Sequence, residues 1–588
     1  MNNGILIQDI YSKAGFESNM PQSLGGPPNV VNMPYHFPPN YEWKNNIQQF
    51  LILVYDTTKQ NNTTISIPYG VQTFVTDIII DWGDGTADKI IWTDGGNSRS
   101  TFHTYSGHGI YTVIVSGRLG RLGRSGPILL PSLIKCYSFG DLGLLSISVG
   151  FGNCPNFIEA PASLPSSITS LASTFLSCTI FNDEKIKYWN TTNITAMNST
   201  FQSASAFNQD LSMWDTSNVT NINSMFNAAR NFNQNIGSWN LSKVTNMGGM
   251  FDTATSFNNG DSPSISGWDT TNNTSLARTF ALTVFNQPIG GWNTINVTTM
   301  NNMFQNCNVF NQSLDNWNVR KVTNFNSMFN LALAFNGSLS GWALGADTLG
   351  TTCSSMFFGA SNFVGSGLGS WDVSKVTTMS NMFRSSKFNT DISSWNVGNV
   401  TSMDAMFSEN SSFNQSLNNW NVTKCTTIAG MFDRATSFNG SVSGWAPGAS
   451  GVGCSCSSLF SSASSFVGSG ISSWNVSKVT NMASMFSSAS AFQADLSTWN
   501  LASLNANTSL DNFMLNKTGA NSYSTVNYDA LLIGWNNNKL VGANGVANWR
   551  TDLRPNFGGA KYTSGGAAAT ARAALVTYGW TITDGGVA

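Results

Sequence analysis

Side chains that could catalyse a reaction are few and widely spaced in this sequence. Asp215, Asp269 and Asp372 each follow a tryptophan, and two carboxylates facing each other across a groove are what glycan hydrolysis requires. Asn follows most of the other tryptophans in the same series, which favours a repeated turn or ladder role over acid–base catalysis. We therefore expect no catalytic residue, and a glycan-degrading enzyme remains only a remote alternative.

Residues that could bind a metal or a cofactor are also few. The histidines are His36, His103 and His108, and no metalloprotease, phosphate-loop or nucleophile-elbow motif accompanies them. Asp81 and Asp84 lie close together, and Ca²⁺ prefers clustered carboxylates, although two aspartates at a turn are more often turn formers. We expect no metal site and no cofactor, and we leave open whether Asp81 and Asp84 bind calcium.

The eight cysteines do not form an obvious disulfide framework. Cys154, Cys178 and Cys307 each lie three residues after a phenylalanine, at a position that alanine occupies elsewhere. Cys454 and Cys456 lack the two-residue spacing of a zinc knuckle. The periodic placement predicts small buried side chains rather than ligands or cross-links.

Composition excludes several classes of function. The 588 residues have a net charge of −2 and only 10 % charged residues, so a nucleic-acid or anionic-membrane partner is not expected. No apolar stretch is long enough to span a bilayer, and the first residues lack the basic and apolar regions of a secretory signal. We expect a protein displayed outside the cell or on a particle, by an export route the sequence does not identify.

A series of thirteen tryptophans sets the organisation of the chain. Their spacing is 25, 25, 29, 24, 25, 25, 29, 24, 25, 25, 29 and 25 residues, and a fixed period of this length indicates a stacked repeat architecture. The tryptophans are Trp189, Trp214, Trp239, Trp268, Trp292, Trp317, Trp342, Trp371, Trp395, Trp420, Trp445, Trp474 and Trp499. We predict that residues 133–509 form a solenoid of coils of about 25 residues, in which each coil buries aromatic side chains against the next.

Each coil has a predictable internal order. The segment Leu211–Trp214 alternates in polarity and predicts a short strand, whereas Met225–Ala229 has helical or 3₁₀ spacing, with Phe226 pointing inward. The longer coils begin at Trp239, Trp342 and Trp445. We expect their loops to protrude, and we expect a ligand there or on the face of the solenoid.

The flanking regions differ from the repeats. Residues 46–117 contain the strand-like runs 50–55, 74–82 and 111–116, rich in β-branched and aromatic residues, and predict a small β-sandwich. Residues 510–588 predict a small α/β cap, with helices over 528–535 and 566–576, a helix stop at Gly579 and a final strand over 580–583.

Two segments are irregular. Residues 1–45 carry six of the sixteen prolines and are equally compatible with a flexible leader or with an arm that docks on a partner or neighbouring subunit. Residues 118–132 form a Gly/Pro linker with Arg118, Arg121 and Arg124. Three arginines at this period could bind an anionic partner, but the composition favours a solvated linker.

The repeat sequence resembles a known family. Typical coils read FNQDLSMWDTSNVTNINSMF (207–226) and FNQSLNNWNVTKCTTIAGMF (413–432), and this pattern is similar to the BspA-like leucine-rich-repeat surface proteins, with repeats of the Mycoplasma-lipoprotein type. The resemblance implies a right-handed, mainly β, leucine-rich-repeat-like solenoid with phenylalanine in place of many leucines. It also implies surface display and adhesion or partner binding.

The region before the repeats resembles a second family. Trp82-Gly-Asp-Gly-Thr86, His103-Thr-Tyr105 and Gly109-Ile-Tyr-Thr-Val113 are similar to motifs of polycystic-kidney-disease-type (PKD) domains. The resemblance implies an immunoglobulin-like sandwich that serves as a spacer or binding module.

These observations predict a non-enzymatic recognition protein. One hypothesis is a structural component of a larger particle, such as a virion decoration or fibre protein, attached through residues 1–45. The alternative is a secreted or cell-surface adhesin that binds a host protein or glycan. The sequence does not identify the ligand, the binding residues or the oligomeric state.

Overall fold

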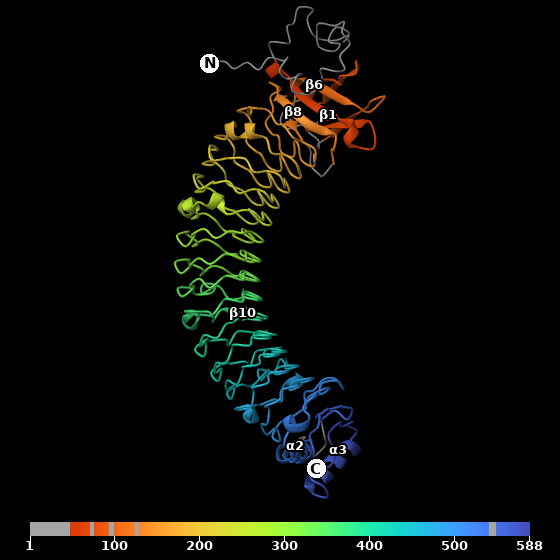
Figure 1. Ribbon diagram of the computed structural model, residues 1–588, viewed down its shortest axis with the longest axis vertical. Coiled ribbons are helices and arrows are strands. Elements are labelled where there is room, and N and C mark those ends of the chain that lie inside the picture. The colour runs from red at the N-terminus through yellow and green to blue at the C-terminus, as the bar shows by residue number, and fades with distance from the viewer. Residues whose placement is uncertain (1–46, 71–75, 93–98, 124–128, 540–548) are drawn as a thin grey trace, which may run out of the picture. The chain divides into compact units, whose positions relative to one another are not determined.

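The structure is a computed structural model that describes residues 47–588 except 71–75, 93–98, 124–128 and 540–548. The predicted N-terminal arm, residues 1–45, and His36 lie outside the described residues. The chain divides into two compact units, coloured by residue number in Figure 1. Unit 1 contains the residues up to Val244 together with Thr253–Gly260, and unit 2 contains Thr245–Asp252 together with Asp261–Ala588.

Unit 1 begins with two antiparallel sheets. The larger sheet has the strand order β4-β3-β6-β1-β8 and the smaller has the order β5-β2-β7 within the described residues. The strands are β1 (Leu51–Asp56), β2 (Thr64–Gly70), β3 (Thr76–Asp81), β4 (Ala87–Trp92), β5 (Arg99–Thr104), β6 (Ile110–Arg118), β7 (Arg121–Leu122) and β8 (Leu133–Phe139), with 3₁₀ turns η4 (Ile47–Gln49) and η5 (Thr57–Lys59). The runs predicted as strands are confirmed as β1, β3 and β6, apart from residues 74–75, which are not described.

The two sheets continue into the first repeats. β8 pairs with β1 on one side, and on the other side Lys135 forms a parallel bridge with Glu159. β7 pairs with β2, and Arg121 forms a parallel bridge with Ser146. The range predicted as a linker, 118–132, therefore contains a strand, and the range assigned to repeats from 133 begins with a strand of the larger sheet.

The repeats are mostly non-helical, and parallel bridges connect each one to the next. In unit 1 Ala196 bridges both Ser170 and Asn221, and in unit 2 Thr299 bridges both Ser275 and Asn324. Figure 1 shows these coils lying one above another within each unit. Because consecutive repeats satisfy each other's backbone groups, long regular strands are not needed to hold the stack.

The prediction of a strand over Leu211–Trp214 is wrong. The segment is a turn, in which the Trp214 N–H donates to the Leu211 carbonyl (3.0 Å) and the Ser212 N–H donates to Asp210 Oδ1 (2.8 Å). The inter-repeat bonds run instead through the following segment, where the bridge to Asn221 lies. The apolar spacing was correct, since Leu211 and Trp214 are both buried, but a turn presents positions i and i+3 on one side as effectively as a strand presents i and i+2.

The helical spacing predicted for Met225–Ala229 corresponds to consecutive turns. The Asn227 N–H donates to the Ser224 carbonyl, and the Ala229 N–H donates to the Phe226 carbonyl. Ser224 and Ala228 have φ angles of 55° and 57°, so the backbone alternates between right- and left-handed conformations and does not form a helix. Phe226 is fully buried, as predicted.

Most tryptophans of consecutive repeats stack on one another within each unit. In unit 2 Trp317 stacks between Trp292 (6.5 Å between ring centroids) and Trp342 (6.4 Å). Its indole N–H donates to the carbonyl of Ile289 in the preceding repeat (3.0 Å). Two phenylalanine columns run beside it, with Phe304 and Phe329 5.4 Å apart. Tryptophan therefore contributes both apolar burial and one satisfied hydrogen bond per repeat.

Asparagine forms a second ladder at the solvent-facing corner. The Asn336 N–H donates to Asn311 Oδ1 (2.8 Å), and the Asn311 N–H donates to Asn286 Oδ1 (2.9 Å). In the same register of unit 1, Asn208 donates to Asn182 in this way. The asparagine side chain accepts from the next repeat in each of these pairs, which explains why the FN dipeptide recurs; valine takes its place at Val364 and Val467.

The longer coils differ in how they use their extra residues. After Trp342 the extra residues lead into β9 (Thr351–Thr352), which pairs with β10 (Val376–Thr378). After Trp445 they lead into β11 (Cys454–Ser455), which pairs with β12 (Val479–Asn481). After Trp239 they lie beyond Phe257, in η7 (Asn259–Asp261) and η8 (Pro263–Gly267). The remaining short turns are η6 (Glu184–Tyr188), η9 (Leu368–Ser370), η10 (Ile471–Ser473) and η11 (Gly519–Asn521).

Two helices cover the last repeat of unit 2. α2 (Thr525–Asn538) begins after Ser524, whose Oγ accepts from the Asn527 N–H, and it packs against α3 (Ala567–Thr577). The Trp535 indole N–H donates to the Leu496 carbonyl (2.9 Å), so the helix supplies the hydrogen bond that another repeat tryptophan would make. Both helices were predicted, but the final strand is reduced to an isolated bridge between Asn556 and Thr583.

Candidate functional site

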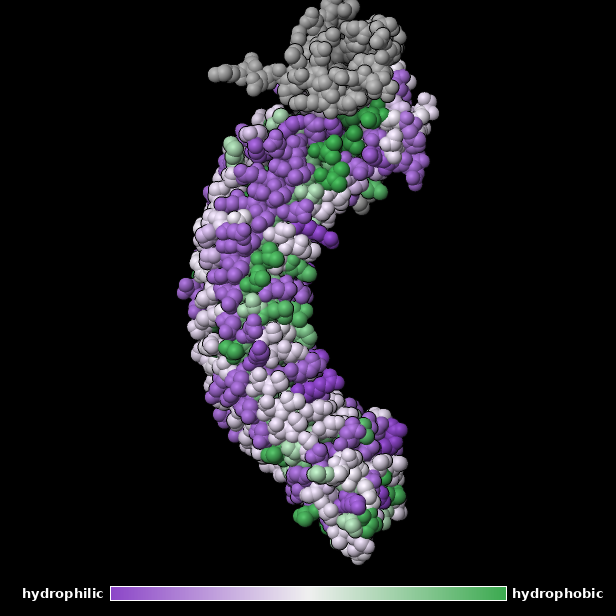
Figure 2. All heavy atoms as spheres, viewed as in Figure 1, coloured by the Kyte–Doolittle hydropathy of each residue, from purple (hydrophilic) through white to green (hydrophobic). Residues whose placement is uncertain are grey.

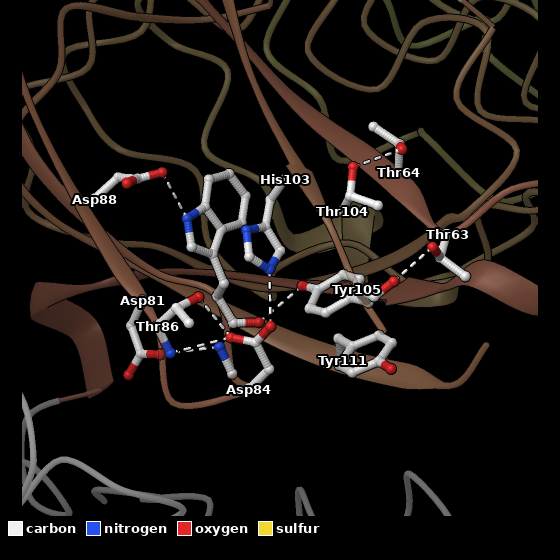
Figure 3. Close-up of polar contacts among 12 residues, drawn as sticks. Thr63, Thr64, Asp81, Asp84, Thr86, Asp88, His103, Thr104, Tyr105 and Tyr111 are labelled. Carbon is white, nitrogen blue, oxygen red and sulfur yellow. Dashed lines mark hydrogen bonds and ion pairs between the residues drawn. The ribbon is translucent and has the colours of Figure 1, made fainter. Parts of the chain in front are cut away.

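An aromatic and acidic cluster lies in the antiparallel-sheet domain of unit 1, around the turn that follows β3. The Trp82 ring stacks on the His103 imidazole, with centroids 4.8 Å apart, and the Trp82 indole N–H donates to Asp88 Oδ2 (2.9 Å). The Tyr105 hydroxyl donates to the Trp82 carbonyl (2.7 Å), and the Tyr105 and Tyr111 rings stack. Figure 3 shows His103 pointing to Asp84 in the turn after β3, with Tyr105 beside it and Tyr111 stacked on Tyr105.

Asp81 and Asp84 are engaged by this turn. Asp84 Oδ1 accepts from the Thr86 N–H (3.0 Å), and Asp84 Oδ2 lies 2.8 Å from His103 Nε2. Although burial acts to raise it, the hydrogen bonds from Thr86 and His103 hold the pKa of Asp84 below its usual value. Asp81 Oδ1 accepts from the Gly83 N–H (2.9 Å), and burial raises the pKa of Asp81. The geometry favours the turn-forming interpretation of the two aspartates over the calcium interpretation.

The remaining metal candidates are dispersed. His108 Nδ1 lies 2.8 Å from the Thr57 carbonyl oxygen, away from the Asp84 and His103 pair. Across residues 47–588, leaving out the undescribed gaps, no group of three or more His, Cys, Asp or Glu side chains could hold a metal ion. None of the helices in the described segments has the length and apolar character needed to cross a bilayer.

The aspartates that follow repeat tryptophans also serve turns. Asp215, Asp269 and Asp372 each accept a hydrogen bond from the N–H two residues ahead, at 2.9–3.0 Å. Hydrogen bonds from Ser217 lower the pKa of Asp215. Asn421, which follows Trp420, accepts the same bond from the Thr423 N–H. The exchange of Asp for Asn is therefore explained by the shared turn, as the sequence pattern indicated.

All eight cysteines are buried and free, which confirms the prediction made from their periodic placement. Burial raises the pKa of Cys307 to about 12, although hydrogen bonds involving Thr283 and the Phe285 carbonyl act to lower it. At neutral pH this thiol is protonated and fills the slot that alanine fills in neighbouring repeats.

A group of exposed aliphatic side chains marks a different kind of site in unit 2. We call it the apolar face and define it as Leu282, Val284, Val309 and Leu333, each 38–46 % exposed. These residues lie in the loops between the two phenylalanine columns of three consecutive repeats. In the coils that Figure 1 draws in green, Figure 2 shows hydrophobic side chains gathered along one edge.

The backbone holds the loops of the apolar face side by side. The Leu282 N–H donates to the Gln305 carbonyl (2.8 Å), and the Asn306 N–H donates to the Asn330 carbonyl (2.8 Å). Val284 and Val309 each precede a stacked phenylalanine of the same column, and those rings, Phe285 and Phe310, are 6.2 Å apart. Val284 and Val309 therefore occupy equivalent positions in neighbouring repeats, and Leu282 and Leu333 lie in the same set of loops.

Ion-paired arginines occur in the repeats near the apolar face. Arg278, two residues before Phe280, binds Asp252 (2.6 Å). Arg384, two repeats beyond Leu333, binds Glu409 (2.9 Å) and lies over the Phe358 ring, 5.6 Å from its centroid. Arginine is enriched in surfaces that bind proteins.

The apolar face departs from the repeat pattern. Later repeats of unit 2 carry polar or charged residues at the position of Leu282, namely Ser385, Glu409, Arg434, Ser462 and Ser488. The tryptophans and phenylalanines that the repeats share do not reveal this face. A comparison of the loops where the repeats differ would have found it.

The longer coils carry a second, smaller apolar feature. Leu349 is 68 % exposed and Val452 is 59 % exposed, and both lie in the extra residues after a tryptophan, 103 positions apart. Their exposure agrees with the protrusion predicted for these coils. The two tips stand four tryptophans apart and do not form a continuous surface with each other.

The repeats match the profile of a known protein family. The profile of the family described as "Mycoplasma protein of unknown function, DUF285" matches residues 169–281, 260–348, 351–452 and 453–527. These matches span more than half of the chain and coincide with its periodic aromatic residues. No curated protein and no solved structure matches the chain.

Proposed function

We propose that this chain, which belongs to the DUF285 family of repeat proteins, is a non-enzymatic recognition protein. It binds a protein partner through the apolar face. We also propose that the repeats are a right-handed, leucine-rich-repeat-like solenoid of the BspA type, preceded by a PKD-like, immunoglobulin-like sandwich. The parallel bridges between repeats and the aromatic columns support this assignment of the repeats.

The observation that carries the function is the contiguity of the apolar face, whose four exposed aliphatic residues lie in three consecutive repeats. We call the buried tryptophan and phenylalanine columns, with the backbone turns that connect them, the frame. The frame holds Leu282, Val309 and Leu333 in its loops, whereas the matching loops of later repeats carry mainly polar residues. An apolar surface left in water has an unfavourable free energy that burial against a partner removes. Aliphatic side chains offer no hydrogen bonds to sugar hydroxyls, so a protein partner fits this face better than a glycan.

The aspartates that follow the repeat tryptophans also fit a binding protein better than an enzyme. The carboxylates in register, such as Asp215 and Asp372, accept hydrogen bonds from their own turns. The solenoid assignment by itself is neutral, because one architecture can host many functions.

A second candidate places the ligand at the longer coils. Leu349 and Val452 are more exposed than any residue of the apolar face, and a partner with two equivalent contacts could engage both tips. The apolar face is favoured because its residues are contiguous, whereas each tip offers one side chain.

We further propose that the chain is displayed on a particle or cell surface, with residues 1–45 as the attachment segment. Fractionation of purified particles, cell envelopes and culture supernatant tests this proposal. Recovery of the intact chain only as free protein would contradict display. Normal assembly of a chain that lacks residues 1–45 would contradict their role in attachment.

The binding proposal is tested with the intact, fluorescently labelled chain on a panel of intact cells. The cells are divided into untreated, protease-treated and periodate-treated samples, because protease removes surface proteins and periodate destroys glycans. We expect saturable binding that protease abolishes and periodate leaves in place. Binding lost only after periodate would contradict a protein partner, and the absence of saturable binding would contradict recognition altogether.

A further inference from the structure

Arg121 occupies an unusual position where the sandwich of unit 1 meets the first repeats. It lies in β7, whose Leu122 pairs with Tyr69 of β2, and its backbone bridges Ser146 of the adjacent repeat. The strand places the guanidinium, which is half-buried, beside the serine-rich ladder that begins at Ser146. The sequence alone favours a solvated linker over an anion-binding role for this arginine.

The guanidinium of Arg121 has no carboxylate partner among the described residues. Its Nε is buried without a hydrogen-bond partner, and its one side-chain hydrogen bond is a long contact of 3.5 Å from Nη2 to the Ser148 carbonyl. Burying a cation without compensation is unfavourable, and burial lowers the pKa of Arg121.

The arginines of unit 2 provide a comparison for Arg121. Every arginine of unit 2 forms an ion pair with an aspartate or glutamate. They are Arg278, Arg320, Arg384, Arg434, Arg550, Arg554 and Arg572. An unpaired, half-buried guanidinium is therefore a departure from the pattern of this protein.

The surroundings of Arg121 supply hydroxyl groups and no negative charge. A hollow of about 490 Å³ is lined by Arg121 and by Ser146, Ser148, Ser167, Thr169 and Ser170, with Leu145 at its wall. Ser148 Oγ lies 3.1 Å from Ser146 Oγ and 3.0 Å from Ser170 Oγ. Ser146 Oγ also accepts from the Ser148 N–H (3.1 Å) and Ser170 Oγ from the Ala172 N–H (3.3 Å). The hydrogens of these three hydroxyls are engaged only with one another, so they can rotate to donate to a ligand.

We propose that this hollow is a binding site for an oxyanion group, such as a sulfate, phosphate or carboxylate. The guanidinium fork of Arg121 binds two oxygens of the group, and the serine hydroxyls donate to the others. The ligand supplies the negative charge that the surrounding residues lack. This site lies in unit 1 and uses none of the residues of the apolar face, so the two proposals stand or fall separately.

Isothermal titration of the intact chain with sodium sulfate, phosphate and acetate, each against sodium chloride at equal ionic strength, tests the proposal. We expect saturable binding of at least one oxyanion at millimolar concentration or below. Arg121→Gln should weaken that binding at least tenfold, whereas Arg230→Gln, which changes an exposed arginine of the same unit, should alter it less than twofold. No saturable binding of any of the three anions, or equal binding by Arg121→Gln, overturns the site.

The source of the group is read from a second set of ligands. A sulfated, a phosphorylated and a uronic monosaccharide are compared with the matching free anions. Tighter binding of a sugar derivative identifies a group carried on a glycan, and tighter binding of the free ion identifies an inorganic ligand. Both results require the oxyanion site.

A measurement on the unaltered chain guards against a variant that fails to fold. An arginine-specific dicarbonyl reagent modifies accessible guanidiniums, and mass spectrometry reports each residue. The bound anion should slow modification of Arg121 and leave that of Arg230 unchanged. Equal rates at Arg121 with and without the anion contradict the proposal.

Discussion

Two stretches of unit 2 share a frame and differ in their surface. The repeats around residues 280–335 and those around 407–492 both bury the same tryptophan and phenylalanine columns. Their loops differ, because the first stretch exposes Leu282, Val309 and Leu333, where the second carries mainly serine and charged residues. The buried positions are therefore the same in both stretches, and the exposed loop positions differ.

The largest expected effect tests whether the frame is equivalent in both stretches. Trp317→Ala and Trp420→Ala each remove a buried ring and the indole hydrogen bond to the preceding repeat. We expect each to lower the free energy of unfolding by about 3–5 kcal/mol, measured by urea denaturation. Costs that differ by more than about 2 kcal/mol would break the equivalence of the two frames.

The stability of the last repeat, which contains Lys517, should depend on pH, whereas that of the two stretches should not. Lys517 fills the buried slot that alanine occupies at Ala489, and its Nζ donates to the Ala489 and Ser490 carbonyls. Burial lowers the pKa of Lys517 to about 8, against about 10.4 in an unfolded chain.

Between those values the folded chain binds fewer protons than the unfolded chain. The free energy of unfolding should therefore rise by up to about 3 kcal/mol as pH increases through this window, and stay at its lower level below it. Lys517→Met should remove the rise, while Lys561→Met, at an exposed lysine, should preserve it. An unchanged slope in Lys517→Met would contradict the assignment.

A smaller effect concerns the left-handed turn that both stretches contain. Ser327 (φ 57°) and Gly430 (φ 59°) occupy the same position before a Met-Phe pair. The nearest atom to a Cβ added at Gly430 is 3.8 Å away, so substitution there tests the backbone conformation without a clash.

We expect Gly430→Ala to lower the free energy of unfolding by about 1 kcal/mol, and Ser327→Gly to raise it by about 0.5 kcal/mol. Thermal or urea unfolding of the two variants measures both changes. Changes of the same sign would show that the two turns are not equivalent.

The sequence allowed much of the frame to be predicted because the frame is what repeats. The tryptophan period, the buried Cys307 and the helix at Trp535 each follow from apolar spacing, which survives whether the local backbone is a strand or a turn. For the same reason the strand over Leu211–Trp214 was mispredicted, since apolar spacing alone does not distinguish a strand from a turn.

The long-coil loops were predicted as a ligand site, but the residues of the apolar face and the hollow at Arg121 were not, because these depend on which loops become neighbours. Val309 is unremarkable in sequence and gains meaning only beside Leu282 and Leu333. Arg121 was noticed, but the lack of a counter-charge is a property of its surroundings. Asp81 and Asp84 lay where expected, and their partners Thr86 and His103 account for them as turn residues.

The central claim is that the apolar face, and not the frame or the long-coil tips, binds the partner. A variant with Leu282→Asp, Val309→Asp and Leu333→Asp should keep the free energy of unfolding within about 1 kcal/mol, because all three side chains are exposed. A control variant carries Leu349→Asp and Val452→Asp at the tips.

The affinity of both variants for the same protein-bearing surface is the most direct measurement. We expect the face variant to lose at least about tenfold in Kd, since the substituted residues form the apolar centre of the interface, and the tip variant to bind as the unaltered chain does. A face variant that binds normally, or a tip variant that loses binding while the face variant keeps it, would contradict the account.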